Sequence, residues 1–193
     1  MSALLQGRSL AREVYDVAVV GAGMVGASTA HYLAKSAPSK RIVLVGPCST
    51  SYPCSHNDYS RIVSSETPDA ATSVSRFPSI EEDSGIPFYN PVGSLVIGAH
   101  DVNEGSQHAQ TLKGFDALVE KFPFFDKSSA AVDGHRIGSE LISRLDGDGG
   151  WINPVDHVIA HTALAARSRC DVVRETVRRV DKSGDVWTIE TTM

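Results

Sequence analysis

The stretch YDVAVVGAGMVGASTAHYLAKSAPSKRIVLV, residues 15–45, decides the fold. Its first six residues, YDVAVV, form a short valine-rich apolar run of the kind that a buried parallel strand requires. A glycine-rich turn follows at once and leads into a helical segment that Pro38 ends. The apolar run RIVLV at 41–45 predicts a second buried strand. Strand, helix and strand together span about the length of one βαβ unit.

The turn between the first strand and the helix reads GAGMVG, which is the G-x-G-x-x-G pattern. Gly21 permits the tight turn out of the strand, Gly23 lets the backbone approach a pyrophosphate, and Gly26 lets the helix pack closely on the strand. The phosphates would bind the N–H groups exposed at the helix N-terminus. We therefore predict a dinucleotide-binding loop made of Gly21, Ala22, Gly23, Met24, Val25 and Gly26.

The residue that usually binds the adenosine ribose is missing from this pattern. An Asp or Glu is expected at the end of the second strand, about twenty residues after the glycines. That position is Gly46, followed by Pro47, and no Arg stands there to accept a 2′-phosphate. We expect the ribose to be held by backbone groups or by a hydroxyl from the three residues 49–51, or to be held poorly.

The remainder of the chain does not continue with a third strand–helix repeat. More than a hundred residues separate the second strand from the next convincing buried strand, at 170–173. Asn153 and Pro154 predict the N-cap and first position of a helix. The other expected elements are a short strand near 61–67, a helix within 68–85 that Pro78 weakens, a strand pair within 88–98, helices at 106–122 and 153–168, a turn at 146–150 and a β-hairpin at 176–192.

Composition and charge exclude several classes of protein. The net charge of −5 gives no reason to expect nucleic acid or an anionic membrane as partner, and no apolar run approaches the ~20 residues of a membrane span. Three cysteines without C-x-x-C spacing argue against a disulfide framework or a zinc site and suit a reducing compartment. His157 and His161 have the i, i+4 spacing of a metal pair, but no third ligand is apparent, so we predict no metal site.

The first fourteen residues lack the apolar core of a secretory signal, although Arg8 and Arg12 faintly resemble a mitochondrial leader. We expect a cytoplasmic protein, with a peroxisomal or mitochondrial location left open.

The segment SHNDYSRI, residues 55–62, narrows the choice of family. On composition alone it is a polar, solvent-exposed loop. It nevertheless resembles the S-H-G-D-[ST]-R-I segment of the sarcosine oxidase and D-amino-acid oxidase-like family of FAD-dependent amine oxidases. The stretches IEEDSGIPFYNPVGSLVIG (80–98) and GGWINPVDHVIAHTALA (149–165) resemble later pieces of the same family in the same order. The resemblance covers roughly residues 15–192.

This resemblance implies a role for the polar loop, which in the family lies beside the isoalloxazine ring of FAD. By position, Ser55 and His56 would contact the cofactor and Arg61 would face the flavin where amine oxidation takes place, so that Arg61 and His56 are the candidate catalytic residues. A cation near the flavin N1–C2=O region stabilises the anionic reduced ring. We expect Asp58 to fix the loop or to pair with Arg61. Val177 falls where the family makes a backbone contact to the adenine.

The fold class implied is α/β: a Rossmann-like FAD/NAD(P)-binding domain with an incomplete sheet, joined to part of an antiparallel β substrate domain. The expected divisions are an N-terminal extension at 1–14, the first βαβ unit and flavin-facing loop at 15–66, a partial substrate or cap region at 67–148, and a return to the FAD-binding domain at 149–193.

The function implied is oxidation by O2 of a secondary amine or amino acid at its CH–NH bond, giving an imine and H2O2. Many relatives carry a second Arg for the substrate carboxylate, where this chain has Ser64, so either the substrate differs or Arg76 or another group supplies the charge. Family members continue beyond the position of Met193, so we expect a fragment with weak or no activity alone. The alternatives are a non-catalytic truncated remnant or an NAD-dependent dehydrogenase. The partner expected is a small amine or amino acid, and the oligomeric state stays open.

Overall fold

The computed structural model of the chain describes residues 13–47, 56–65, 67–99 and 141–192. The chain divides into two compact units, which are described separately. The first unit comprises Met1–Tyr59, Ile80–Phe88 and Asn153–Met193, and the second comprises Ser60–Ser79 and Tyr89–Ile152. The helix expected at 106–122 lies outside the described residues.

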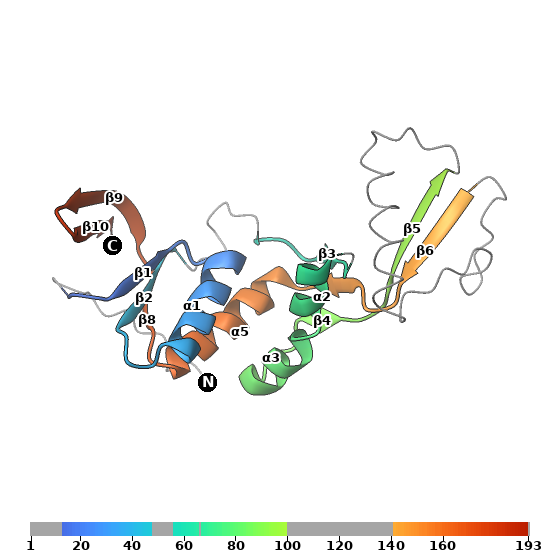
Figure 1. The fold of residues 1–193 in the computed structure, drawn as a ribbon, viewed down its shortest axis with the longest axis horizontal. Helices are drawn as coiled ribbons and strands as arrows, with labels where there is room; N and C mark the ends of the chain where they lie inside the picture. The colour runs from blue at the N-terminus through green and yellow to red at the C-terminus, as the bar shows by residue number, and fades with distance from the viewer. Residues whose placement is uncertain (1–12, 48–55, 66, 100–140, 193) are drawn as a thin grey trace. The chain divides into compact units, whose positions relative to one another are not determined.

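A three-stranded parallel sheet forms the centre of the first unit (Figure 1). Its strands are β1 (Val17–Val20), β2 (Ile42–Val45) and β8 (Asp171–Val173), in the order β1-β2-β8. All four residues of β2 are buried, as expected for a strand covered on both faces. The predicted strands at 15–20, 41–45 and 170–173 are therefore confirmed, and they place their carboxyl ends along one edge.

Two helices pack side by side on one face of this sheet (Figure 1). They are α1 (Met24–Ser36) and α5 (Pro154–Arg167), which Asn153 caps by accepting hydrogen bonds at its side-chain oxygen, as predicted. Small buried side chains line the contact and allow the two helices to approach closely. These side chains are Ala27, Ala30, Ala34 and Ala165, which pack with Ile42, Leu44 and Val158.

The opposite face of the sheet carries Val43, Val45 and Val173, against which Val177 packs. Val177 belongs to β9 (Thr176–Ser183), which forms an antiparallel hairpin with β10 (Val186–Thr192). Gly184 has a φ of +60° in the connecting turn, a conformation that glycine adopts readily. The hairpin predicted for the end of the sequence is thus confirmed.

Two short helices occupy the region where Pro78 weakens the helix prediction. They are α2 (Pro68–Val74), capped by Thr67, and α3 (Phe77–Ser84). Pro78 is tolerated because it lies in the first turn of α3, where a backbone N–H has no intrahelical partner to lose. Among the helices that the structure describes, none is both long enough and apolar enough to cross a membrane.

The second unit is built from short antiparallel strands. One sheet has the order β3-β7-β4 and consists of β3 (Arg61–Val63), β7 (Gly150–Ile152) and β4 (Tyr89–Asn90). A second pairs β5 (Ser94–Ala99) with β6 (Leu141–Asp146). The interrupted strand pair predicted within 88–98 corresponds to β4 and β5.

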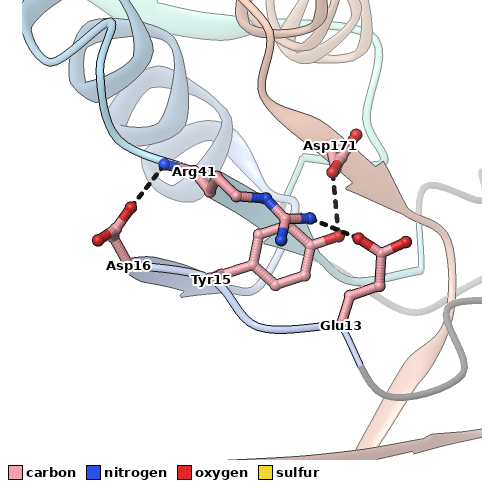
Figure 2. Close-up of polar contacts among 5 residues, drawn as sticks. All are labelled: Glu13, Tyr15, Asp16, Arg41 and Asp171. Carbon is pink, nitrogen blue, oxygen red and sulfur yellow. Dashed lines mark hydrogen bonds and ion pairs between the residues drawn. The ribbon is translucent and has the colours of Figure 1, made fainter.

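Charged and polar side chains tie together the amino ends of the three parallel strands in the first unit (Figure 2). The Tyr15 hydroxyl donates a hydrogen bond to Asp171 at 3.0 Å, and the Arg41 guanidinium lies over the Tyr15 ring, 4.9 Å from its centroid. Arg41 also forms an ion pair with Glu13, and its backbone N–H donates to Asp16 at 2.8 Å. We call these five residues the amino-end cluster.

Candidate nucleotide site at the glycine loop

The glycine loop depends on the backbone conformation of Gly21 and on the lack of space for a side chain at Gly26. Gly21 has a φ of +105°, and its N–H donates to the carbonyl of Val45 at 2.7 Å. A Cβ built on Gly26 would lie 1.7 Å from the Gly21 carbonyl oxygen, far inside any allowed contact. These two glycines are therefore required by the fold, because they bring the start of α1 directly against the end of β1.

The amino end of α1 offers backbone donors without competing side chains. Gly23 is the N-cap and supplies no side-chain hydrogen bond, and the first turn contains no acidic residue. The first N–H groups of a helix have no intrahelical partner and carry the positive end of the helix dipole. Val25 in this turn is 81% exposed, so the end of the helix is open to solvent. The arrangement suits a pyrophosphate group, as the sequence predicts.

His56 lies against this loop. A Cβ built on Gly23 would come 3.4 Å from Nδ1 of His56, so the imidazole sits directly beside the N-cap of α1. Burial lowers the pKa of His56 below its ordinary value of 6.5, so the ring is neutral at pH 7. A neutral imidazole has one donor and one acceptor nitrogen, which suits a polar ligand without adding charge. The same loop is shaped locally by Asp58, whose carboxylate accepts from the Tyr59 N–H at 2.7 Å.

The backbone around position 46 leaves no room for a ribose-binding carboxylate. A Cβ built on Gly46 would lie 2.5 Å from the backbone nitrogen of Ala22 and 3.2 Å from the carbonyl carbon of Gly21. The Gly46 N–H donates to the carbonyl of Val173 at 3.0 Å, which holds this backbone in place between β8 and the glycine loop. Any side chain here, a carboxylate included, would displace the loop that is expected to bind phosphate.

The remaining residues singled out from the sequence lie in different places. Arg61 begins β3 of the second unit, opposite Ile152, and donates to the carbonyl of Ser60 at 3.2 Å. Val177 belongs to the first unit, where its side chain packs on the face of the sheet that carries Val43 and Val45. Ser55 and the three hydroxyl residues at 49–51 lie outside the described residues.

A buried histidine cluster between α1 and α5 was not anticipated from the sequence. Nδ1 of His31 lies 3.0 Å from Nδ1 of His161, and the rings of His157 and His161 have centroids 4.5 Å apart. Desolvation lowers the pKa of His157 to about 4, and desolvation followed by repulsion from the other two histidines lowers the pKa of His161 to about 3. All three rings are thus neutral at pH 7. The described residues contain no group of three ligating side chains arranged to hold a metal ion.

The family described as FAD dependent oxidoreductase matches residues 16–193 of the chain. No curated protein sequence matches it.

Several solved structures share the fold. The L-amino acid deaminase of Proteus vulgaris is 18% identical over 98% of the chain, with a TM-score of 0.69. A Tyr258Phe mutant of NikD, an amino acid oxidase essential for nikkomycin biosynthesis, is 21% identical over 92%, with a TM-score of 0.63. The glycine oxidase of Bacillus cereus is 20% identical over 93%, with a TM-score of 0.59.

The chain spans about half the length of these proteins, since it covers 47%, 47% and 53% of the three chains in the order given. At such identities the likeness establishes the fold. The predicted fold class, a Rossmann-like FAD-binding fold with an incomplete sheet and an antiparallel β part, is confirmed.

Proposed function

The chain belongs to the FAD dependent oxidoreductase family, and from that premise we propose that its first unit binds the pyrophosphate of FAD at the start of α1. The observation that carries this proposal is the open amino end of α1, where Gly23 leaves the backbone donors uncovered and His56 borders them. The phosphate-binding residues are Gly21, Ala22, Gly23, Met24, Val25 and Gly26. The adenine would meet the backbone of Val177.

The ribose would be held without a carboxylate. Gly46 approaches Ala22 too closely for an acidic side chain, so hydrogen bonds from backbone groups or from hydroxyls in 49–51 would take its place. This arrangement disfavours an NAD-dependent dehydrogenase, whose nucleotide is oriented by a carboxylate at this position.

We further propose that the polar segment 55–61 borders the flavin ring, as its likeness to the S-H-G-D-[ST]-R-I segment suggests. Ser55 and His56 would donate or accept hydrogen bonds at the ring. When bound, the flavin would supply the redox chemistry, a two-electron oxidation of the substrate with oxygen as the final electron acceptor. The guanidinium of Arg61 would stabilise negative charge near N1–C2=O.

The substrate class proposed for the whole protein is a small amine or amino acid, by analogy with the amino acid oxidases and the deaminase that share the fold. The substrate would lose two electrons and two hydrogens at its CH–NH bond to become an imine, and O2 would become H2O2. Ser64 cannot form a bidentate contact with a substrate carboxylate. With Ser64 at this position, either the substrate lacks a carboxylate or Arg76 binds that carboxylate in its place.

Titration of the purified chain with FAD tests the proposal, with binding followed by flavin fluorescence and absorbance. We expect Gly23→Ala to weaken binding at least about tenfold, because the proposed role of this glycine is to let the backbone approach the pyrophosphate without a Cβ between them. The fold should tolerate this change, since the new Cβ stands 3.4 Å from His56.

Thr29→Ala, at an exposed position further along α1, is the control and should leave the affinity for FAD unchanged. A folded wild-type chain that takes up no FAD would refute the proposal and favour a non-catalytic role.

A further inference from the structure

The second unit contains a carboxylate that is completely buried. Asp146, the last residue of β6, is 0% exposed. Both of its oxygens accept hydrogen bonds from one residue: Oδ2 from the backbone N–H of Ser65 at 2.7 Å, and Oδ1 from the Ser65 hydroxyl at 2.6 Å. Because a buried carboxylate that loses its hydrogen-bond donors is left with a large desolvation penalty, this pair resists separation.

The surroundings of Asp146 are packed to the point where glycine is required. A Cβ built on Gly149 would lie 2.8 Å from Oδ2 of Asp146 and 2.7 Å from Cβ of Ser94. A Cβ built on Gly150 would lie 2.1 Å from the carbonyl oxygen of Asn90. The carboxylate therefore has little freedom to move, and it serves as a fixed acceptor at the point where β6 ends and the turn into β7 begins.

Ser65 connects this fixed acceptor to the strand that carries Arg61. β3 is only three residues long and lies at the edge of its sheet, where it pairs with β7 from Arg61↔Ile152 to Val63↔Gly150. An edge strand of this length gains little stability from its backbone hydrogen bonds to β7. Ser65 follows β3 by two residues, so its two hydrogen bonds to Asp146 hold the carboxyl end of the strand from a second side.

We propose that Asp146 is a positioning residue: through Ser65 it holds β3 in register and thereby sets the position of the Arg61 guanidinium. The functional part of this inference rests on the proposed function, because it concerns the use of Arg61 at the flavin. Asp146 would act on the electrostatics of the bound flavin and leave the phosphate site of the first unit unchanged.

Three substitutions separate hydrogen bonding from charge. Asp146→Ala removes both acceptors. Asp146→Asn keeps an oxygen for the Ser65 N–H, and its amide can donate to the Ser65 hydroxyl oxygen, so both contacts survive without the charge. Asp148→Ala is the matched control, because Asp148 is an exposed acid in the same turn. Should Asp146→Ala fail to fold, Ser65→Ala, which keeps the backbone hydrogen bond, replaces it.

The first measurement is amide hydrogen exchange of β3 and Ser65 in the chain without ligand. We expect exchange to quicken by about tenfold or more in Asp146→Ala and to stay near wild type in Asp146→Asn and Asp148→Ala. Unchanged exchange in Asp146→Ala would overturn the inference, as would an Asp146→Asn variant that behaves like Asp146→Ala.

The second measurement is the midpoint potential of bound FAD, with its dissociation constant taken in parallel. Asp146→Ala should lower the potential in the same direction as Arg61→Ala while the dissociation constant changes by less than about threefold, and Asp146→Asn should restore it. An unchanged potential despite faster exchange would show a merely structural role. Wild-type chain that takes up no FAD defeats the proposed function itself, whereas normal uptake with an unaffected potential defeats this inference alone.

Discussion

The two ends of the parallel sheet in the first unit are built by opposite means. At the amino end, side chains cross from strand to strand: Tyr15 reaches Asp171, and Arg41 reaches Glu13 (Figure 2). At the carboxyl end, Gly21, Gly26 and Gly46 bring backbone against backbone with no side chain between. The amino end is held by exposed polar contacts, and the carboxyl end by steric fit.

This difference supports the proposal that the carboxyl end of the sheet binds the cofactor. Exposed hydrogen bonds and ion pairs each contribute little and can be lost one at a time. Close backbone contacts tolerate no added atom, but they leave N–H groups accessible at the start of α1. Substitutions at the carboxyl end should therefore have the largest effects, and those at the amino end the smallest.

Gly26→Ala should have the largest effect. Its Cβ would overlap the Gly21 carbonyl oxygen at 1.7 Å, and only displacement of α1 from β1 can relieve that contact. We expect a loss of more than about 3 kcal/mol in the free energy of unfolding, measured by urea denaturation. Ala27→Gly, the neighbouring position, is a control that should lose only about 1 kcal/mol through helix propensity and some lost packing. A Gly26→Ala chain with native stability would show that the close approach is not required.

Gly46→Asp sharpens the comparison because it introduces the residue type expected from the motif. If the carboxylate were simply missing, this substitution would strengthen FAD binding. The 2.5 Å approach of the new Cβ to the Ala22 nitrogen predicts instead a loss of about 2–3 kcal/mol in the free energy of unfolding and weaker FAD binding. Urea denaturation and FAD titration measure both quantities, and a tighter complex would contradict the steric explanation.

Acid should destabilise the packing of α1 against α5, where the buried histidines lie, without acting directly on either end of the sheet. Burial lowers the pKa of His157 from 6.5 to about 4, so the folded state resists protonation that the unfolded chain accepts. The stability contributed by the neutral ring is complete above pH 6.5 and is lost as the pH falls toward 4. At about pH 5 we expect His157 to account for a loss of about 2 kcal/mol relative to pH 7.

His157→Leu should remove that part of the pH dependence, when the free energy of unfolding is measured between pH 7 and about pH 5. The other two histidines of the cluster also contribute to the pH dependence of both proteins. The pKa of His161 is lowered to about 3, and the pKa of His31 is lowered by burial and by Lys35 and raised by Asp83. Equal slopes in wild type and variant would contradict the assignment.

Tyr15→Phe should have the smallest effect, about 0.5–1 kcal/mol, because it removes one exposed hydrogen bond and leaves the ring under Arg41. Burial and the Asp171 carboxylate raise the pKa of Tyr15 from 10.0 to about 12. The hydroxyl's contribution is therefore present below pH 10 and is lost as the pH rises toward 12. Ultraviolet titration of wild type and variant should differ by the phenol of Tyr15, which ionises at high pH in wild type. If no such difference is found, the hydrogen bond from Tyr15 to Asp171 is contradicted.

The glycine loop could be predicted from the sequence because its requirements are local. The turn, the close approach and the helix start each depend on one residue type at one position within 21–26. The contact between His31 and His161 joins residues 130 positions apart, and that between Ser65 and Asp146 joins residues 81 positions apart. No local pattern marks such a pair, because each member is an ordinary polar residue until the fold brings the partner close.

Position 46 shows where the two kinds of information divide. The residue types and their spacing were enough to establish a βαβ unit and the lack of a ribose carboxylate, and to predict a phosphate-binding loop. The close approach of Gly46 to Ala22, which leaves no room for that carboxylate, exists only once β2 and the glycine loop are in place. Local backbone preferences and hydrophobic periodicity depend on residues that are neighbours in the sequence. Steric exclusion and burial depend on atoms of residues that are distant in the sequence and come close only in the folded chain.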